Sequence, residues 1–198
     1  MRITTWNINS VRIRLDLVRR LVKELKPDVL CLQETKVPDD LFPHRAFADL
    51  GFQHRRVHGM KGYNGVAILS RVPFSGGAPL PRCGKQDCRH LYARLPGGVE
   101  LHNIYIPAGG DIPAPQANDK SLDWVDAVRH FIPAEERLYT WWSYRNRDWK
   151  VSDRGRRLDH VWVTPALKGK LRGASVHRDA RDWESGSDHV PVTVEVGD

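Results

Sequence analysis

The chain has 198 residues and a mass of 22.6 kDa, with 40% hydrophobic and 28% charged residues. This suits one domain with a core of ordinary size and excludes a collagen-like or largely disordered chain. The 31 Lys and Arg against 24 Asp and Glu give a formal net charge of +7, which favours a polyanionic partner such as nucleic acid over a merely solvated basic surface.

The first 34 residues predict a strand, a helix and a second strand. Residues 2–9 mix apolar and polar side chains, as a half-buried strand does. Apolar residues then recur at helical spacing over 11–25, with Ser10 placed to cap the helix and Pro27 to end it. Residues 28–34 form an apolar run without alternation, which is typical of a strand buried on both faces.

After the second strand the pattern changes to short β segments. One more helix is expected between Asp39 and Leu50, with Gly51 at its carboxyl end. Short apolar or alternating runs follow, separated by Gly- and Pro-containing turns, at 66–69, 91–95, 99–106, 158–163 and 190–196. We therefore predict one α/β domain over residues 1–198, with a mainly β core and helices packed outside.

Two segments between these strands are unusual. Residues 107–123 are rich in Pro and Gly, a composition typical of functional or flexible loops. Residues 138–157 combine Trp and Tyr with many arginines, which can stack on bases and neutralise phosphates. The alternative is that the arginines are solvated and that Trp141 and Trp142 pack in the core. A place in the core is compatible with one of these two tryptophans.

Polar residues with catalytic chemistry stand at the ends of predicted strands. Asn7 and Glu34 close the first two strands, Asp159 begins another, and Asp188 and His189 precede the last. Their oxygen atoms suit Mg²⁺ or Mn²⁺, and a His beside a carboxylate can act as an acid. Taken singly, each is more often structural, because an Asp or Asn at a strand end usually caps a turn.

The sequence also bears on location and assembly. It contains no run of about 18 apolar residues and no apolar stretch of signal-peptide length near Met1. Its three cysteines, Cys31, Cys83 and Cys88, fit a reducing compartment better than a disulfide scaffold. We expect a cytoplasmic monomer with no membrane partner.

Five motifs follow one another in a specific order. They are Thr-Trp-Asn-Ile-Asn-Ser at 5–10, Leu-Gln-Glu-Thr-Lys at 32–36, Asn-Ile-Tyr-Ile-Pro-Ala-Gly at 103–109, Arg-Leu-Asp-His at 157–160 and Ser-Asp-His at 187–189. Together they resemble the exonuclease III family of DNA-repair enzymes, within the endonuclease/exonuclease/phosphatase superfamily, over nearly the whole chain. The resemblance implies a four-layered α/β sandwich, in which two packed, mainly antiparallel β-sheets carry helices on both outer faces.

The resemblance also implies an activity and a cofactor. The activity is hydrolysis of phosphodiester bonds in duplex DNA during base excision repair, with incision 5′ to abasic sites, 3′-to-5′ exonuclease action and repair of blocked 3′ ends. The cofactor is Mg²⁺, with Mn²⁺ as the other metal considered. In this family pattern Glu34 is the main metal ligand with Asn7 beside it, and Asp188 lies in the metal or phosphate shell.

The remaining site residues follow from the same resemblance. Tyr105 and His189 would contact the scissile phosphate, and Asp159 would orient His189. The aromatic wall for the abasic sugar corresponds to Trp141 and Trp142. With the basic residues around them, the predicted DNA-binding set is Trp141, Trp142, Arg145, Arg147, Arg156 and Arg157.

One motif of the family is missing. Between the tyrosine motif and the Trp-rich segment the family carries Gly-Asp-x-Asn, whose Asp is the favoured base for the attacking water. Here Gly-Asp-Ile-Pro at 110–113 lacks the Asn, and Asn118 precedes Asp119 in the reverse order. The family pattern has several tens of residues more between Lys120 and Leu122, including a helix and the strand with this motif. We therefore predict an internal deletion near 120–122, which leaves the second half of the sandwich incomplete.

Three functions are compatible with these residues. The first is a DNA phosphodiesterase of abasic-site repair, which we favour as the evolved function. The second, close behind it for this polypeptide, is a catalytically impaired DNA-binding relative that lacks the water-activating Asp. The third is a phosphatase or phosphodiesterase acting on a lipid or small phosphoester, which the segment rich in Arg and Trp disfavours.

Overall fold

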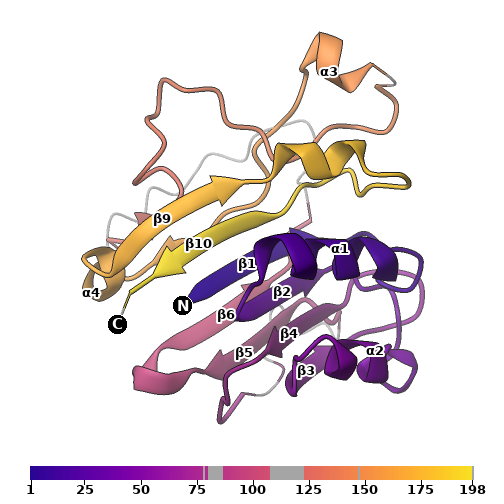
Figure 1. Ribbon diagram of the computed structural model, residues 1–198, viewed down its shortest axis with the longest axis vertical. Helices are drawn as coiled ribbons and strands as arrows, with labels where there is room; N and C mark the ends of the chain where they lie inside the picture. Colours follow the sequence, from indigo (N-terminus) through magenta and orange to yellow (C-terminus); the bar gives the residue numbers. More distant parts are fainter. Residues whose placement is uncertain (78, 80–86, 108–122, 147, 198) are drawn as a thin grey trace.

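The computed structural model describes residues 1–77, 79, 87–107, 123–146 and 148–197 (Figure 1). Its largest element is a six-stranded sheet with the order β3-β4-β2-β1-β10-β9, in which β1 and β2 are parallel and the other neighbours antiparallel. The strands are β1 (Arg2–Asn7), β2 (Val29–Gln33), β3 (His54–His58), β4 (Val66–Ser70), β9 (Leu171–Val176) and β10 (Val192–Val196).

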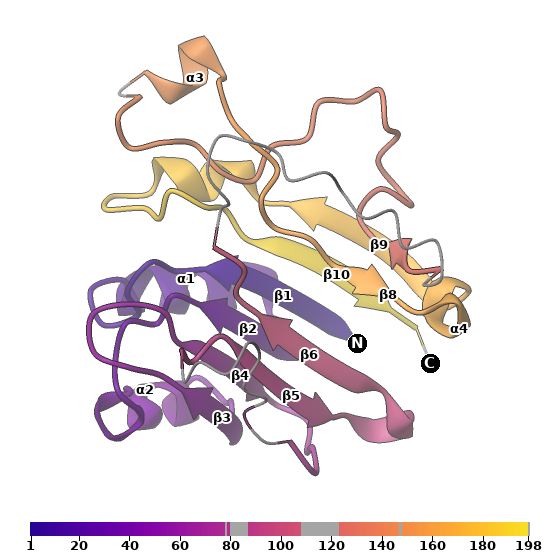
Figure 2. The ribbon, with the colours of Figure 1, turned by 180° about the vertical axis from the view of Figure 1, so that it is seen from behind.

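Over the residues that the structure describes, the second layer of strands consists of two separate pairs. β5 (His90–Arg94) pairs with β6 (Glu100–Ile104), and β7 (Val125–Asp126) pairs with β8 (Trp162–Val163). Figure 2 shows both pairs on the same side of the six-stranded sheet, with β6 and β8 as the neighbouring members. The two sheets of the predicted sandwich are therefore present, but the second is divided.

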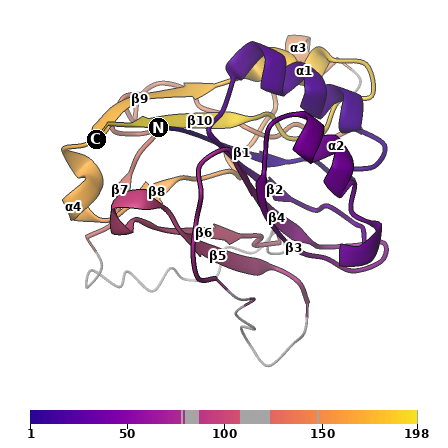
Figure 3. The ribbon, with the colours of Figure 1, turned by 60° about the horizontal axis from the view of Figure 1, so that its bottom comes forward.

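Helices cover the other face of the six-stranded sheet (Figure 3). α1 (Leu15–Leu25) buries Val18, Leu21 and Val22 on that face, in a core that also contains Trp6. α2 (His44–Asp49) adds Phe47 to the same core.

α1 begins later than the sequence predicted. Ser10 does not cap it, because Ser10 has a left-handed backbone (φ 83°) and its N–H donates to the carbonyl of Glu34 at 2.7 Å. The helix ends as predicted before Pro27, with Lys26 in the left-handed conformation.

The single helix predicted over 39–50 is divided. A 3₁₀ turn spans Asp39–Leu41, and α2 begins only at His44 because Pro43 cannot continue a helix that starts before it. The other short helices are α3 (Trp149–Ser152), α4 (Pro165–Lys168) and 3₁₀ turns at Pro96–Gly98 and Arg178–Asp182. Among the described residues, no helix has the length and apolar character needed to cross a membrane.

The space between the layers holds two apolar cores. β2 and β4 contribute Val29, Cys31, Val66 and Ile68, which pack against Leu91, Ala93 and Leu95 at β5. The valines of β10 pack against the segment that contains β8, in the cluster Ala127, Val128, Leu138, Val163, Leu171, Val192, Val194 and Val196. Each strand pair of the second layer thus has its own core.

The predicted α/β fold, with two layers of β-strands and helices packed outside, is confirmed. In the part of the chain that the structure describes, no helix packs on the outer face of β5 and β6, so helices flank only one side (Figure 3). The strand predicted over 158–163 is reduced to β8, and Ile104 and Trp162 on the outer face are 49% and 54% exposed. The sequence did not predict β3 or β9, which form the two edges of the large sheet.

Candidate active site

A carboxylate stands at the end of β2, where the chain turns sharply. Glu34 has a left-handed backbone (φ 52°), and its Oε1 accepts a hydrogen bond of 2.8 Å from Nδ2 of Asn7 at the end of β1. The Nζ of Lys36 lies 2.9 Å from its Oε2. Burial alone would raise the pKa of Glu34, but the hydrogen bonds from Asn7, Lys36 and Tyr105 and the Lys36 charge outweigh burial and lower it. Glu34 is therefore held as an anion.

A phenol from the second layer meets this carboxylate. Tyr105 follows β6, and its hydroxyl forms a hydrogen bond with Glu34. Burial, together with the negative charge of Glu34, raises the pKa of Tyr105 to about 12. The hydroxyl thus stays protonated at neutral pH and donates its one hydrogen to Glu34, because the ionised carboxylate can only accept.

A His–Asp pair faces them from the C-terminal half. Nδ1 of His189 lies 2.8 Å from Oδ2 of Asp159, and the two side chains are only 11% and 8% exposed. Burial opposes the charged imidazolium, but the charge of Asp159 and the hydrogen bond to it raise the pKa of His189. The pair leaves Nε2 of His189 to donate a proton or a hydrogen bond.

Backbone contacts fix both members of this pair. The Oγ1 of Thr140 accepts hydrogen bonds of 3.0 Å from the backbone N–H groups of Leu158 and Asp159. The indole N–H of Trp6 donates to the carbonyl of His189 at 3.0 Å. The pair is therefore anchored to the central strand β1 on one side and to the Trp-rich segment on the other.

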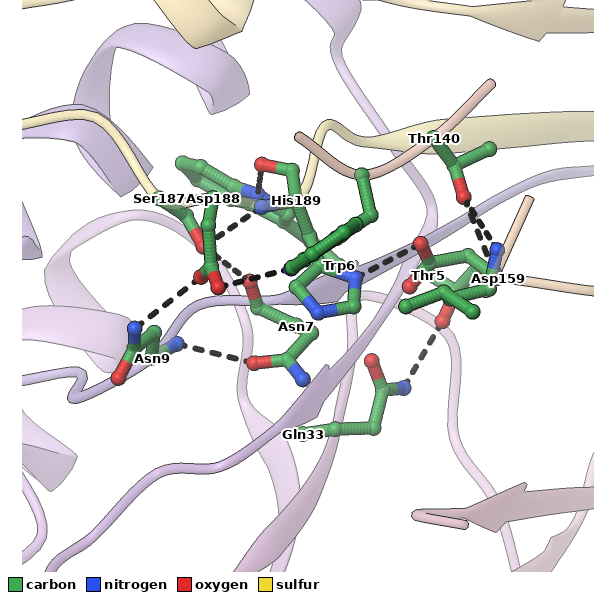
Figure 4. Close-up of polar contacts among 12 residues, drawn as sticks. Thr5, Trp6, Asn7, Asn9, Gln33, Thr140, Asp159, Ser187, Asp188 and His189 are labelled. Carbon is green, nitrogen blue, oxygen red and sulfur yellow. Dashed lines mark hydrogen bonds and ion pairs between the residues drawn. The ribbon is translucent and has the colours of Figure 1, made fainter. Parts of the chain in front are cut away.

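The third carboxylate lies at the same rim (Figure 4). Asp188 accepts a hydrogen bond of 3.1 Å from Nδ2 of Asn9 and one of 2.9 Å from Nε1 of Trp141. Next to it, the hydroxyl of Ser187 donates to the backbone carbonyl of Asn7 at 2.7 Å. The structure thus brings the predicted residues Asn7, Glu34, Tyr105, Asp159, Asp188 and His189 together.

The structure contradicts the prediction for two members of the predicted DNA-binding set, Trp142 and Arg157. Trp142 is fully buried and packs against Trp149, with ring centroids 5.0 Å apart, so it has no surface on which a sugar or base could stack. Arg157 is also assigned wrongly, because its guanidinium forms an ion pair with Asp126 and its side chain is only 16% exposed. Both residues stabilise the segment rather than face a ligand.

The other members remain candidates. Trp141 is partly exposed beside Asp188, and the exposed Arg156 lies over its ring at 5.9 Å. Arg145 is exposed on the same segment. Arg147 and the predicted deletion at 120–122 lie outside the described residues.

Three contributors were missed at the sequence level: Lys36, Asn9 and Thr140. Lys36 has a left-handed backbone like Glu34, and this turn directs the two side chains toward one another. Thr140 acts through backbone contacts with the chain near Asp159, far away in the sequence. The only available signal was that Lys36 and Asn9 lie within motifs already singled out.

The donor set fits a hard divalent cation. Glu34 is ionised and holds the Lys36 ammonium at 2.9 Å, which shows that a cation is stabilised at this oxygen. No group of three or more His, Cys, Asp or Glu side chains among the described residues could enclose a metal ion. One or two carboxylates, an amide oxygen and water are what Mg²⁺ commonly takes, whereas zinc requires a fuller set of protein ligands.

Comparisons with known proteins agree with this geometry. A profile of the endonuclease/exonuclease/phosphatase family matches residues 4–189. Exodeoxyribonuclease III of Haemophilus influenzae is 25% identical over an alignment of 268 positions, which covers 98% of this chain and 99% of the relative. An exodeoxyribonuclease of Bacillus subtilis is 28% identical and covers 97% and 98% of the two chains.

Solved structures show the same similarity. A 3′ phosphatase from Neisseria bound to a product DNA hairpin gives a TM-score of 0.87 at 29% identity, with 99% of both chains covered. An AP endonuclease from Archaeoglobus fulgidus gives a TM-score of 0.87 at 28% identity, also with 99% of both chains covered.

Proposed function

The chain belongs to the endonuclease/exonuclease/phosphatase family, and from this premise we propose that it is a divalent-metal-dependent DNA hydrolase of the exonuclease III type. Its reactions would be incision 5′ to abasic sites and removal of nucleotides or blocking groups from 3′ ends. The observation that carries the proposal is the convergence of Glu34, Tyr105 and the His189–Asp159 pair at one rim of the sandwich.

The residues have complementary roles toward a phosphodiester. Glu34 and Asn7 would hold Mg²⁺, which when bound would stabilise negative charge on the phosphate and the leaving oxygen. Tyr105 stays protonated, and its one hydroxyl hydrogen, which Glu34 accepts in this structure, would pass to a phosphate oxygen when the cation occupies Glu34. His189 would donate from Nε2 to the same group, while Asp159 fixes the ring and favours its charged form.

The charge of the chain supports DNA as the substrate. The net charge of +7 favours binding to a polyanion, and Trp141 with Arg156 offers an indole surface and a guanidinium beside Asp188. A small phosphoester would use the phosphate-binding residues without needing this segment. We therefore keep duplex DNA ahead of a lipid or small phosphoester as the substrate.

A specific observation favours a second candidate, a DNA-binding relative with impaired catalysis. Each carboxylate of the site is already engaged: Glu34 with Asn7 and Lys36, Asp159 with His189, and Asp188 with Asn9 and Trp141. In the part of the chain that the structure describes, each carboxylate of the site is thus held by a partner, which disfavours it as the base that activates water.

We propose that the deletion near 120–122 removed this base. The alignment with the relative from Haemophilus runs over 268 positions, which 198 residues cannot fill, so several tens of positions face gaps in this chain. Loss of a general base costs about 10²–10⁴-fold in rate and leaves binding intact.

Both candidates are tested with one labelled duplex that carries a single abasic analogue. Incision is measured in Mg²⁺ and in EDTA, and binding is measured by gel shift in EDTA. The same protein is also assayed for phosphate release from inositol phosphates.

EDTA-sensitive incision on the 5′ side of the lesion would support the hydrolase. Binding without incision would support the impaired relative. A folded sample that neither binds nor cuts the duplex at low salt, or that prefers inositol phosphates, would overturn both DNA-directed functions.

A further inference from the structure

Two buried amides join the two layers of the sandwich beside the candidate active site. Gln33 at the end of β2 and Asn103 in β6 are 7% and 3% exposed. Nε2 of Gln33 donates to Oδ1 of Asn103 at 2.7 Å, which forms an amide link between the layers. Both residues belong to motifs of the sequence, and the proposed reaction uses neither. Each is close to a site residue, because Glu34 follows Gln33 and Tyr105 lies two positions after Asn103.

The Asn103 amide spans two strands of the large sheet. Its Nδ2 donates to the backbone carbonyls of Leu32 in β2 and Ala67 in β4, both at 2.9 Å, and these two residues are partners in the β2–β4 ladder. The orientation of the amide follows from these contacts, because carbonyl oxygens only accept and so require the nitrogen to face them. Its Oδ1 is therefore turned toward Gln33.

The Gln33 amide extends the link to β1. Its Nε2 has two hydrogens, and it donates one to Asn103 and the other to Oγ1 of Thr5 at 2.8 Å (Figure 4). Hydrogen bonds of 2.7–2.9 Å thus connect β6 with three neighbouring strands of the large sheet, β4, β2 and β1. These bonds offset the cost of burying two amides, a cost that remains if one partner is removed.

The contacts around the amide link are apolar. Asn103 is paired with Leu91 of β5, which packs with Cys31 and Ile68 in the core between the layers. Apolar contacts are non-directional and do not by themselves fix one layer on the other, whereas an amide bonded to fixed carbonyls has a single position. Asn103 therefore sets the position of β6 on the large sheet.

The placement of Tyr105 depends on this position of β6. Its backbone N–H donates to the carbonyl of Arg89 at 2.8 Å, which continues the β5–β6 ladder. Side chains at alternate positions of a strand point to the same face, so Tyr105 leaves the strand on the side of Asn103, about 7 Å further along. There its hydroxyl meets Glu34 at the end of β2. The contact between Tyr105 and Glu34 thus lies one step beyond the amide link.

We propose that Asn103 is a positioning residue, which acts with Gln33 to align the ends of β6 and β2. This alignment holds the Tyr105 hydroxyl against Glu34. Its consequence for catalysis rests on the proposed function, in which Tyr105 passes its hydrogen to a phosphate oxygen. Misplacement of such a group by about 1 Å costs up to about 100-fold in rate.

The alternative is a purely structural role, in which the amides stabilise the core and Tyr105 meets Glu34 without them. Both roles predict a loss of stability when the link is broken, so stability does not separate them. The ionisation of Tyr105 does. Burial and the negative charge of Glu34 raise its pKa to about 12, and this pKa falls if the hydroxyl moves away from Glu34.

The test measures the pKa of Tyr105 by NMR in the full-length chain, with its tyrosines carrying ¹³C at Cζ. Tyr105→Phe identifies the resonance, and circular dichroism at each pH verifies that the protein is folded. Asn103→Leu keeps the branched shape of the side chain and removes its three hydrogen bonds. Gln33→Met is the milder variant, because it leaves Asn103 its bonds to the two carbonyls.

Leu101→Ala is the matched control for loss of packing. Leu101 lies in β6 two positions before Asn103, on the same face, and packs against the same apolar core. Its apolar side chain cannot take part in the amide link. Any change that this variant shares with Asn103→Leu reports general loosening of the core.

We expect the pKa of Tyr105 to fall toward the ordinary value of about 10 in Asn103→Leu, to fall less in Gln33→Met and to stay unchanged in Leu101→Ala. An unchanged pKa in folded Asn103→Leu, or an equal fall in Leu101→Ala, would overturn the proposal. If Asn103→Leu does not fold, Gln33→Met decides between the same two outcomes.

Incision of the abasic duplex tests the consequence for catalysis. We expect kcat to fall about 10- to 100-fold in Asn103→Leu with little change in KM, and to fall no further when Asn103→Leu is added to Tyr105→Phe. Equal losses in the two backgrounds would overturn the proposal, because the amides would then act independently of Tyr105. Wild-type protein that does not incise would count against the proposed hydrolase alone, since the pKa measurements need no catalysis.

Discussion

The two halves of the sandwich differ in completeness although one chain builds both. The six-stranded sheet has a fully paired interior and buries the inner positions of β2, β4 and β10. The second layer packs on one face of this sheet, and the described part of the chain supplies two pairs of strands there. Over the described residues, the large sheet and its helices thus form a continuous unit, whereas the second layer is divided.

This difference divides the active site as well. Asn7 and Glu34 stand on adjacent central strands of the complete sheet, and the backbone carbonyls of Asn7 and His189 bind Ser187 and Trp6. Tyr105 directly follows β6, and Asp159 lies shortly before β8. In the function we propose, cation binding would rest on Asn7 and Glu34 at the large sheet. The phosphate contact of Tyr105 and the orientation of His189 by Asp159 would depend on the second layer.

The largest expected effect falls on the complete half. Glu34→Gln removes the charge that holds the cation, and we expect incision of the abasic duplex to fall about 10³-fold, because the metal supplies several kcal/mol of charge stabilisation. DNA binding in EDTA should be unchanged. The matched control is Glu24→Gln, which removes an exposed α1 carboxylate paired with Arg20. Equal activity of the two variants would contradict the assignment of Glu34.

The second prediction compares the stability of the two halves. Leu30→Ala in β2 creates a cavity at a fully buried site, and we expect the free energy of unfolding to fall by about 2–5 kcal/mol. Ile104→Ala in β6 removes an exposed side chain and should change it by less than about 0.5 kcal/mol. Urea unfolding followed by tryptophan fluorescence measures both. A large loss with Ile104→Ala would show that the β6 edge is covered.

The third prediction concerns the pair that orients the phosphate. Asp159→Asn keeps the shape but removes the charge that raises the pKa of His189, so the imidazolium should lose its proton at lower pH. We expect a loss of about 10²-fold at neutral pH, with the alkaline limb of the pH–rate profile shifted to lower pH. Asp16→Asn, at an exposed ion pair of α1, is the control. A shift in the opposite direction would contradict the role given to Asp159.

The same pKa shift affects stability. Because the pKa of His189 is raised in the folded protein, its contribution is fully present below the unfolded value of about 6.5 and is lost as pH rises through the folded pKa. The wild type in EDTA should therefore lose stability across that interval. His189→Gln should lose less over the same interval, as measured by urea unfolding at several pH values. Identical slopes for the two proteins would argue against a charged His189.

The smallest effect is expected on DNA affinity. Arg156→Ala removes one exposed cation beside Trp141, so binding should weaken several-fold and the slope of log affinity against log salt should fall by about one. Arg157→Ala breaks the ion pair with Asp126 and should lower stability with little change in that slope. Gel shifts at a series of salt concentrations separate the two. A larger change in this slope for Arg157→Ala than for Arg156→Ala would indicate that Arg157 contacts DNA.

The sequence predicted the site better than the elements around it. Asn7, Glu34, Asp159 and His189 carry motifs whose chemistry and order are readable, and the structure brings them together. The roles of Trp142 and of the arginines around it could not be predicted from the sequence, because the burial of a side chain depends on contacts between distant segments. Trp142, for example, is enclosed by Trp149 and by Arg178 from a later turn.

The elements that were missed have a common physical reason. β3 has the sequence His-Arg-Arg-Val-His and lies at the edge of the large sheet. Its charged residues hide the alternation of apolar and polar side chains that marks a half-buried strand. The start of α1 moved because Ser10 bonds to the carbonyl of Glu34, a contact between two loops that no local pattern contains. Hydrogen bonds between distant segments thus determine features, such as the start of α1, that the periodicity of apolar residues could not predict.

Amide hydrogen exchange of the free protein, read strand by strand, tests the contrast between the two halves most directly. We expect slow exchange in β1, β2 and β4, and fast exchange for those β6 and β8 amides that do not donate to β5 or β7, because unpaired edge groups are exposed to water. Uniformly slow exchange in β6 and β8 would contradict the divided second layer, and with it our explanation for the missing catalytic base.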